Sequence, residues 1–181
     1  VLDVGANKGQ FSLLARMLWP DCRIIAYEPL TAPARKFRAL FGADPLVEFH
    51  QVAIGKKNES CEMHVSRRDD SSSLFPISEL QIEFAPGTDE VSTEVVRVAP
   101  LSDFLSPKQI AQPALLKIDV QGYELAVLEG CEPLLHRFDY IYCELSFREL
   151  YSGQSLSDDV IRWLHHGEFS LAAVNHISLD S

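Results

Sequence analysis

The stretch "VLDVGANKGQFS", residues 1–12, decides the fold. A short apolar run of strand length meets Gly5, and a second glycine, Gly9, follows four positions later. Beyond it, apolar residues recur at the spacing of one helix face, at Phe11, Leu14, Ala15 and Leu18. A strand, a glycine turn and a helix in this order place free backbone N–H groups and the positive helix end at the carboxyl edge of a sheet. The pattern therefore predicts a ligand-binding turn.

Two phosphate-binding motifs are excluded for this turn. Gly9 is followed by Gln10 and Phe11, so the Gly-Lys-Ser/Thr ending of a nucleoside-triphosphate loop is absent. Asn7 occupies the position where the dinucleotide fingerprint has its middle glycine. Taken alone, the turn is as compatible with a purely structural role as with a ligand site.

Five further runs have strand length and are apolar nearly throughout: "RIIAYEP" (23–29), "VEFHQVAIG" (47–55), "ALLKIDVQG" (114–122), "YIYCELSF" (140–147) and "FSLAAV" (169–174). Continuous apolar runs are typical of strands that are buried on both faces of a parallel sheet. Helical patterns lie between them over residues 31–42, 125–135 and 157–167, and we expect Pro133 to break the second. This alternation predicts an α/β fold with a doubly wound, mostly parallel sheet of Rossmann-like type.

Residues 55–113 interrupt the alternation of strands and helices. Two further strands are expected there, "CEMHVS" (61–66) and "TEVVRVAPL" (93–101). We expect a hairpin insertion between the third and fourth core strands, with a mobile loop over residues 66–90, which are rich in Ser, Asp and Pro. No repeat or second domain is visible, so we expect a single domain over residues 1–181. Because Val1 already lies inside a strand, we expect this domain to be truncated at both ends.

Composition excludes some classes of function. The chain is 46% hydrophobic and has a formal net charge of −10 at pH 7, which argues against binding nucleic acid or an anionic membrane through bulk charge. No apolar run approaches the roughly 18 residues of a membrane span, and no signal-peptide pattern is visible. The four cysteines lack metal-ligand spacing, so we expect reduced thiols, no metal site and a cytoplasmic protein.

Glu28 gives the glycine turn its first specific interpretation. It follows the second predicted strand, 19 residues after Gly9. A carboxylate at this position can accept hydrogen bonds from both ribose hydroxyls of a nucleoside-type cofactor. The alternative is an ordinary exposed acid at a strand end. The glycine turn and Glu28 together favour an adenosyl cofactor.

Three residues are candidates for acid–base chemistry. Asp119 follows the buried strand "ALLKIDVQG", at the switch-point crevice where open α/β sheets bind ligands. Glu144 lies late in the next strand and is expected to face the same crevice, although a structural pair with Arg148 is an equal alternative. His50 is an outside candidate. Helix capping is the alternative for Asp119, and for Glu124 we prefer a role at the helix start.

Four blocks of this sequence, in their order and spacing, resemble the FkbM family of S-adenosylmethionine-dependent methyltransferases. They are "VLDVGANKGQFS", "AYEP", "VAIG" and "LLKIDVQGYELAVLEG", of which the last is the most distinctive. "VVRVAPLSDFL" and "SSSL" match as well, so the likeness spans residues 1–144. The resemblance implies a class I methyltransferase fold with a reversed hairpin strand at the far end of the sheet. Because the chain ends soon after "AVNHISLDS", we expect that strand to be partial or missing.

The resemblance also implies a site for S-adenosylmethionine. The methionine portion would be surrounded by residues of the first turn, Gly5, Asn7 and Gly9. Asp3 would hold that turn, and Glu28 would take the ribose hydroxyls. The adenine would lie beside a short apolar stretch, Val52, Ala53 and Ile54. Asp119 would lie near the transferred methyl group and act as the base, with Glu144 or His50 as alternatives.

Members of the family chiefly methylate hydroxyl oxygens on sugars and polyketide-type natural products, so the resemblance implies a small-molecule or glycan hydroxyl acceptor. The loop serines Ser71, Ser72 and Ser73 are expected to form a lid that contacts it. A different methyl acceptor, such as a nitrogen or a carboxylate, is one alternative. Two further alternatives concern the class of protein. A nicotinamide-dependent oxidoreductase would share the glycine turn and Glu28, and a non-catalytic module would bind an adenosyl cofactor without turnover.

Overall fold

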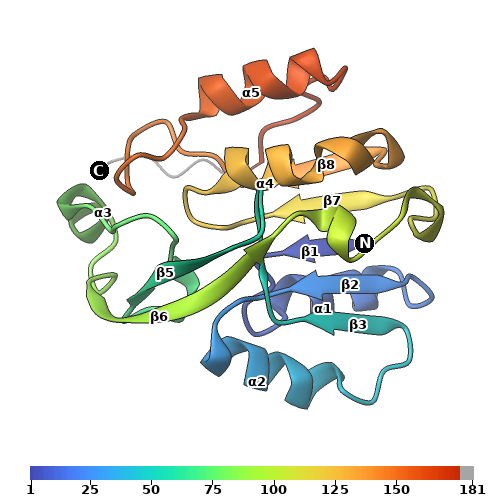
Figure 1. The fold of residues 1–181 in the computed structure, drawn as a ribbon, viewed down its shortest axis with the longest axis horizontal. Coiled ribbons are helices and arrows are strands. Elements are labelled where there is room, and N and C mark those ends of the chain that lie inside the picture. Colours follow the sequence, from blue (N-terminus) through green and yellow to red (C-terminus); the bar gives the residue numbers. More distant parts are fainter. Residues whose placement is uncertain (176–181) are drawn as a thin grey trace.

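A computed structural model describes residues 1–175 of the chain. Its centre is a five-stranded sheet in the order β3-β2-β1-β7-β8 (Figure 1). The strands are β1 (Leu2–Val4), β2 (Ile24–Tyr27), β3 (Val47–His50), β7 (Leu115–Ile118) and β8 (Tyr140–Cys143). All four neighbouring pairs are parallel, which confirms the predicted α/β fold. The strand order reverses between β1 and β7, so the ligand crevice is expected at their carboxyl ends.

Alternate residues of the strands face two different helix layers. Leu2 and Val4 point into the larger core, which includes α4 (Glu124–Cys131) and α5 (Ser157–His166). Asp3, between them, contacts Ser12 of α1 (Gln10–Leu18) on the opposite face. On β2, Ala26 packs against α2 (Thr31–Phe41) on that second face. Both faces are covered, so the sheet is doubly wound as the apolar strands predicted.

The run "VEFHQVAIG" divides into two strands of different sheets. It ends in the central sheet at His50, and the chain then turns, with the Val52 N–H donating to the His50 carbonyl at 3.1 Å. The short β4 (Ala53–Ile54) belongs to a second sheet of order β4-β6-β5.

A hairpin makes up most of the second sheet. It pairs β5 (Glu59–Ser66) and β6 (Glu90–Ala99) antiparallel, and it lies between the third and fourth strands of the central sheet in chain order. In Figure 1 the hairpin lies to the left of the central sheet, on the side toward which the arrows of the central strands point. Its connection contains a 3₁₀ turn, η1 (Asp69–Ser71), and a short helix, α3 (Glu79–Phe84). Mobility of residues 66–90 stays a prediction.

Two expectations about elements need correction, and a third is confirmed. The predicted strand "FSLAAV" forms no regular structure, because residues 170–174 are exposed and β8 has no outer neighbour in the described chain. The helix after Gly9 exists, but Leu14 and Leu18 are exposed while Ser12 and Ala15 are buried. Residues 125–135 divide, as Pro133 predicted, into α4 and a 3₁₀ segment, η4 (Glu132–Arg137).

Smaller 3₁₀ turns complete the chain before β7, η2 (Leu101–Asp103) and η3 (Pro107–Gln109). Within residues 1–175, none of the helices is long and apolar enough to cross a membrane. The end of the expected last strand, residues 176–181, lies outside the described residues.

Candidate functional site

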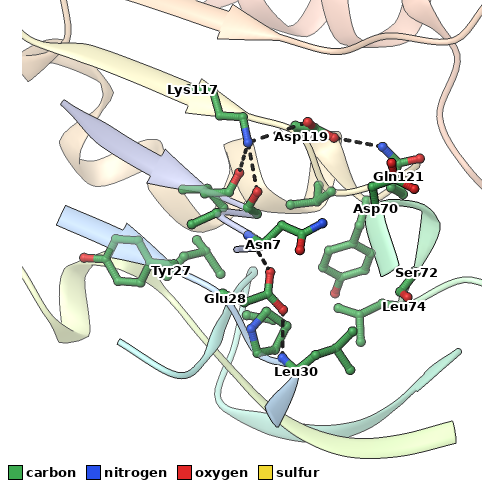
Figure 2. Close-up of a pocket in the computed structure, with 18 of the residues that line it drawn as sticks. Asn7, Tyr27, Glu28, Leu30, Asp70, Ser72, Leu74, Lys117, Asp119 and Gln121 are labelled. Atoms are coloured by element: carbon green, nitrogen blue, oxygen red, sulfur yellow. Dashed lines mark hydrogen bonds and ion pairs between the residues drawn. The ribbon is translucent and has the colours of Figure 1, made fainter. Parts of the chain in front are cut away.

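A cavity of about 300 Å³ opens at the carboxyl edge of the central sheet, where β1 and β7 diverge (Figure 2). Its walls come from the turns after β1, β2 and β7, from β4, and from the hairpin connection. Eight of the predicted site residues line it: Gly5, Asn7, Glu28, Val52, Ala53, Ile54, Ser72 and Asp119. Residues scattered over more than a hundred positions of the sequence therefore meet in one crevice.

Gly5 sets the width of this crevice. Its φ of +76° is in the left-handed region that favours glycine. A Cβ added there would lie 1.8 Å from the backbone oxygen of Asp119, so the turns after β1 and β7 touch at this residue. Gly9 has a different role, because a Cβ there would meet Phe37 and Phe41 of α2. It lies outside the cavity lining and allows the start of α1 to pack closely against α2.

Glu28 is buried at the end of β2 and faces the cavity (Figure 2). Its Oε2 accepts the Asn7 N–H at 3.0 Å, and its Oε1 accepts the Leu30 N–H at 2.8 Å. Burial raises the pKa of Glu28 to about 7, although both backbone hydrogen bonds act in the opposite direction. Two backbone groups thus fix the carboxylate, and each oxygen keeps a lone pair for a ligand.

Asp3 lies behind the cavity and is fully buried. Its Oδ2 accepts the Ser12 hydroxyl at 2.7 Å, and its Oδ1 lies 3.1 Å from Lys117 Nζ. The Lys117 ammonium also donates to the Gly5 carbonyl at 2.9 Å. Asp3 therefore holds the glycine turn through Lys117, and it has no place in the cavity lining.

Lys117 is a site residue that the sequence reasoning missed. Its side chain is only 6% exposed, lines the cavity, and lies between Asp3 and Asp119. Burial alone would lower the pKa of Lys117, but the carboxylates of Asp3 and Asp119 outweigh that effect and raise the pKa. The ammonium stays charged. The available signal was a lysine inside the apolar strand "LLKI", since a buried lysine needs a charged partner.

Asp119 and Glu144 are connected through Gln121. The Gln121 Nε2 donates to Asp119 Oδ1 at 2.8 Å and to Glu144 Oε2 at 2.7 Å. Asp119 lines the cavity with its side chain 42% exposed, whereas Glu144 lies outside the lining. Surrounding protein atoms and the Asp119 charge raise the pKa of Glu144, even though this residue keeps an exposed surface.

Glu124 has the structural role that we preferred. It is the first residue of α4 and is buried. Its Oε1 accepts the Gly122 N–H at 3.0 Å and the Val120 N–H at 3.3 Å, which fixes the turn after β7. Burial raises the pKa of Glu124 to about 7.

His50 does not reach the cavity lining. Its ring stacks on Tyr27 with centroids 5.1 Å apart and also contacts Phe104. Its Nε2 lies 2.8 Å from Glu48 Oε1. The ring is therefore held at the edge of the sheet beside β3, and its predicted acid–base role gains no geometric support.

Residues 69–74 cross over the cavity, and we call this segment the strap. Near the first turn, Asp69 lies 2.7 Å from Lys8 Nζ and 3.4 Å from Lys36 Nζ. At the other end, the Ser73 hydroxyl donates to the Gln121 carbonyl at 2.6 Å. The strap is thus pinned to the turns after both β1 and β7.

The strap serines have different surroundings. All three loop serines are buried, but only Ser72 is in the cavity lining; Ser71 and Ser73 face the protein. Asp69 and Asp70, which the sequence reasoning did not single out, also line the cavity. These two residues belong to no recognisable sequence motif. They line the cavity because the connection between β5 and β6 passes beside it.

Similarity to known proteins agrees with this architecture. The Methyltransferase FkbM domain profile matches residues 3–171. The chain belongs to this family. The FkbM domain described here is similar to the 2-O-methyltransferase NoeI of Sinorhizobium fredii, at 27% identity over 163 residues, covering 85% of this chain and 66% of NoeI.

Two more curated relatives have similar identity. Methyltransferase 1 of Beauveria bassiana is 29% identical, covering 73% of this FkbM domain and 58% of that protein. The 31-O-demethyl-FK506 methyltransferase FkbM of Streptomyces tacrolimicus is 28% identical, covering 73% of this chain and 59% of that protein. The chain spans less than two thirds of the length of these relatives.

A solved structure supports the fold of this FkbM domain. The crystal structure of methyltransferase FkbM from Methylobacillus flagellatus KT superposes with a TM-score of 0.51 at 14% identity. The match covers 77% of this chain and 31% of that one. At this identity the likeness concerns the fold alone.

Proposed function

We propose that the protein is an S-adenosylmethionine-dependent methyltransferase that methylates a hydroxyl of a small molecule or glycan. The observation that carries the proposal is the acidic lining of the switch-point cavity. Four carboxyl groups line it, Glu28, Asp69, Asp70 and Asp119, and Lys117 is the single lining ammonium among the described residues. Lys117 is paired with Asp3 and Asp119, while Asp69 and Asp70 also have cations outside the lining, Lys8 and Lys36 for the first and Arg68 for the second. Such a lining attracts a sulfonium cation and repels the pyrophosphate of a nicotinamide dinucleotide.

The lining has groups that match each part of this cofactor. Asn7 Oδ1 is a buried acceptor without a hydrogen-bond partner, and it suits the ammonium of the methionine portion. Glu28 can accept from the ribose hydroxyls. An apolar wall suits the adenine ring; it consists of Leu30, Val52, Ile54, Met63 and Leu74.

The bound cofactor would supply a methyl group activated by its positive sulfur, so the protein has to orient the acceptor and exclude water. The strap covers the cavity, which favours exclusion of water. Asp119 is the candidate base for the acceptor proton, because it lines the cavity at the end of β7. Its Oδ2 lies 3.6 Å from the ammonium of Lys117.

The relatives' names support oxygen as the acceptor atom. The printed names of NoeI and of the Streptomyces enzyme describe methyl transfer to oxygen in those proteins. The net charge of −10 argues against a nucleic-acid acceptor. The four cysteines are free, which favours a reducing compartment, and we propose the cytoplasm.

The test uses the full-length protein, labelled S-adenosylmethionine, and a panel of hydroxylated sugars and polyketide-type alcohols. Asp119→Ala should keep cofactor affinity within about threefold and lose about 10²–10⁴-fold in turnover. Asp21→Ala, which removes an exposed carboxylate far from the cavity, is the matched control and should leave both unchanged. Full turnover by Asp119→Ala would remove Asp119 from the role of base.

A further inference from the structure

Parallel strands bring two carboxylates to the same edge of the sheet. β7 and β8 pair in register with Ile118 opposite Cys143, so the next residues, Asp119 and Glu144, leave neighbouring strand ends together. Side by side, two carboxylates repel each other unless a donor or a shared proton lies between them. The Gln121 amide provides that donor, since its one Nε2 contacts an oxygen of each.

The orientation of the Gln121 amide is fixed by a second contact. Its Oε1 lies 2.8 Å from the hydroxyl of buried Tyr151, and the Ser71 carbonyl lies 3.1 Å from the same hydroxyl. Burial raises the pKa of Tyr151, so the hydroxyl keeps its one proton, and the shorter of the two contacts is the one to Gln121. An amide whose oxygen accepts from a hydroxyl must present its NH₂ on the other side. That side faces the two carboxylates.

The Gln121 backbone is also constrained. It has a positive φ of 55°, in the sparsely populated left-handed region for a residue other than glycine. Its carbonyl accepts the Ser73 hydroxyl from the strap. Backbone and side chain are both held, so the position of the Gln121 Nε2 donor is fixed. Figure 2 shows this nitrogen pointing toward Asp119.

We propose that Gln121 is a positioning residue that holds the Asp119 and Glu144 carboxylates as one proton-accepting pair at the edge of the cavity. The inference rests on the proposed function. As the acceptor oxygen bonds to the methyl carbon, the carbon–sulfur bond breaks with its electron pair remaining on sulfur. The hydroxyl proton passes to Asp119 and is then shared with Glu144.

The two carboxylates differ in their other neighbours. Lys117 Nζ lies 3.6 Å from Asp119 Oδ2, so Asp119 has a cation on one side and the Gln121 donor on the other. Further titratable groups face the pair from α4, β8 and the segment after β8, namely Glu124, Cys143 and Tyr151. Burial raises the pKa of each of these three groups, as it raises the pKa of Glu144.

The test removes the donor while preserving the shape of the side chain. In the full-length protein, Gln121→Met should raise the pH at which the pair takes up its first proton by about one unit. Carbon-13 NMR of labelled carboxyl groups, without any substrate, measures this titration. Tyr151→Phe should cause a smaller shift in the same direction, because the amide is then free to rotate. Gln112→Met is the control, since that exposed glutamine contacts Asp139 at the far end of β7.

Activity gives the second readout. With any acceptor from the hydroxyl panel, Gln121→Met should lower kcat about 10–100-fold and move the acid limb of its pH profile to higher pH. The Kd for S-adenosylhomocysteine should change less than about threefold. If Gln121 has only a structural role, the carboxyl groups should titrate at the same pH in the variants as in wild type. An unchanged titration in both Gln121→Met and Tyr151→Phe would overturn the proposal.

The outcomes separate the two proposals. If the wild-type protein binds no S-adenosylhomocysteine, the proposed function fails, and the positioning role fails with it. If wild type transfers methyl groups and Gln121→Met does so with an unchanged pH profile, only the positioning role is overturned. If Gln121→Met does not fold, the titration of Tyr151→Phe decides, and an unshifted curve overturns the positioning role.

Discussion

At Glu28, burial and ligand binding act on the same carboxylate in opposite directions. Without a ligand, burial holds the pKa near 7, so a large fraction of the protein is protonated below neutral pH. Ribose hydroxyls donate to the ionised form and should lower that pKa on binding. Under the proposed function, cofactor affinity is therefore expected to depend on the ionisation of Glu28.

The first prediction follows from this linkage. The Kd for S-adenosylhomocysteine should be lowest above about pH 7 and should rise about tenfold per pH unit below it, because a proton must then leave Glu28 on binding. Calorimetry across this range measures it. Glu28→Gln should bind weakly and without this slope. A wild-type Kd that is independent of pH would refute the linkage.

The same shift affects stability in the opposite sense. The folded pKa of Glu28 lies above the ordinary glutamate value, so its contribution to stability is complete below about pH 4.5 and is lost as pH rises through about 7. Glu124 shifts in the same direction. The sites that hold these carboxylates therefore make the ligand-free fold less stable at neutral pH.

Individual residues differed in how well the sequence predicted them. Glu28 and Asp119 follow strand ends, and strand ends of a parallel sheet meet at one edge, so their place in the cavity could be predicted. Gln121 could not, because its role depends on which way its amide points. That direction comes from Tyr151, 30 residues further along the chain.

At the scale of elements, the strap contributes one wall of the cavity, and its role as a lid is a prediction. The ion pair of Asp69 with Lys8 connects it to the first turn, and the ion pair of Asp69 with Lys36 connects it to α2. These side chains are partly exposed. Exposed ion pairs are weak and are screened by salt. This end of the strap is therefore the one expected to open for cofactor exchange.

The second prediction concerns Asp69→Asn, which removes both ion pairs of the strap. It should weaken S-adenosylhomocysteine binding about 2–10-fold, mainly through faster release, and should make release less sensitive to salt than in wild type. Stopped-flow release measurements check it. Asp89→Asn, which removes an exposed ion pair with Arg67 in the same hairpin connection, should have no such effect. Equal rates of S-adenosylhomocysteine release from Asp69→Asn and Asp89→Asn would argue against opening of the strap as the route of release.

Hydrogen exchange tests the predicted mobility of residues 66–90 separately. The amides of the strap should exchange faster in the free protein than in the complex. Equal exchange in the two states would count against a lid.

Element boundaries were less predictable than element types. "VEFHQVAIG" contains no glycine or proline before its last residue, so no breaker indicates that it changes sheets at Gln51. The inward face of α1 was misjudged for a related reason. Its position depends on the polar contact between Ser12 and Asp3, which hydrophobic periodicity does not detect.

At the scale of the whole molecule, the excess of acidic residues in the composition agrees with the carboxylates that line the cavity. The chain has ten more acidic than basic residues, and carboxylates gather around the cavity rather than a phosphate-binding cradle. The sequence alone left the nicotinamide and adenosyl alternatives open, because both use a glycine turn and an acid after the second strand. The cavity lining, which only the folded chain assembles, is what supports the adenosyl alternative in the proposed function.

The most direct measurement is a calorimetric titration of the full-length protein with S-adenosylmethionine and, separately, with NAD⁺. One S-adenosylmethionine should bind per chain with a Kd of about 1–100 μM, and NAD⁺ should give no binding. No binding of S-adenosylmethionine, or equally tight binding of NAD⁺, would contradict the proposed function.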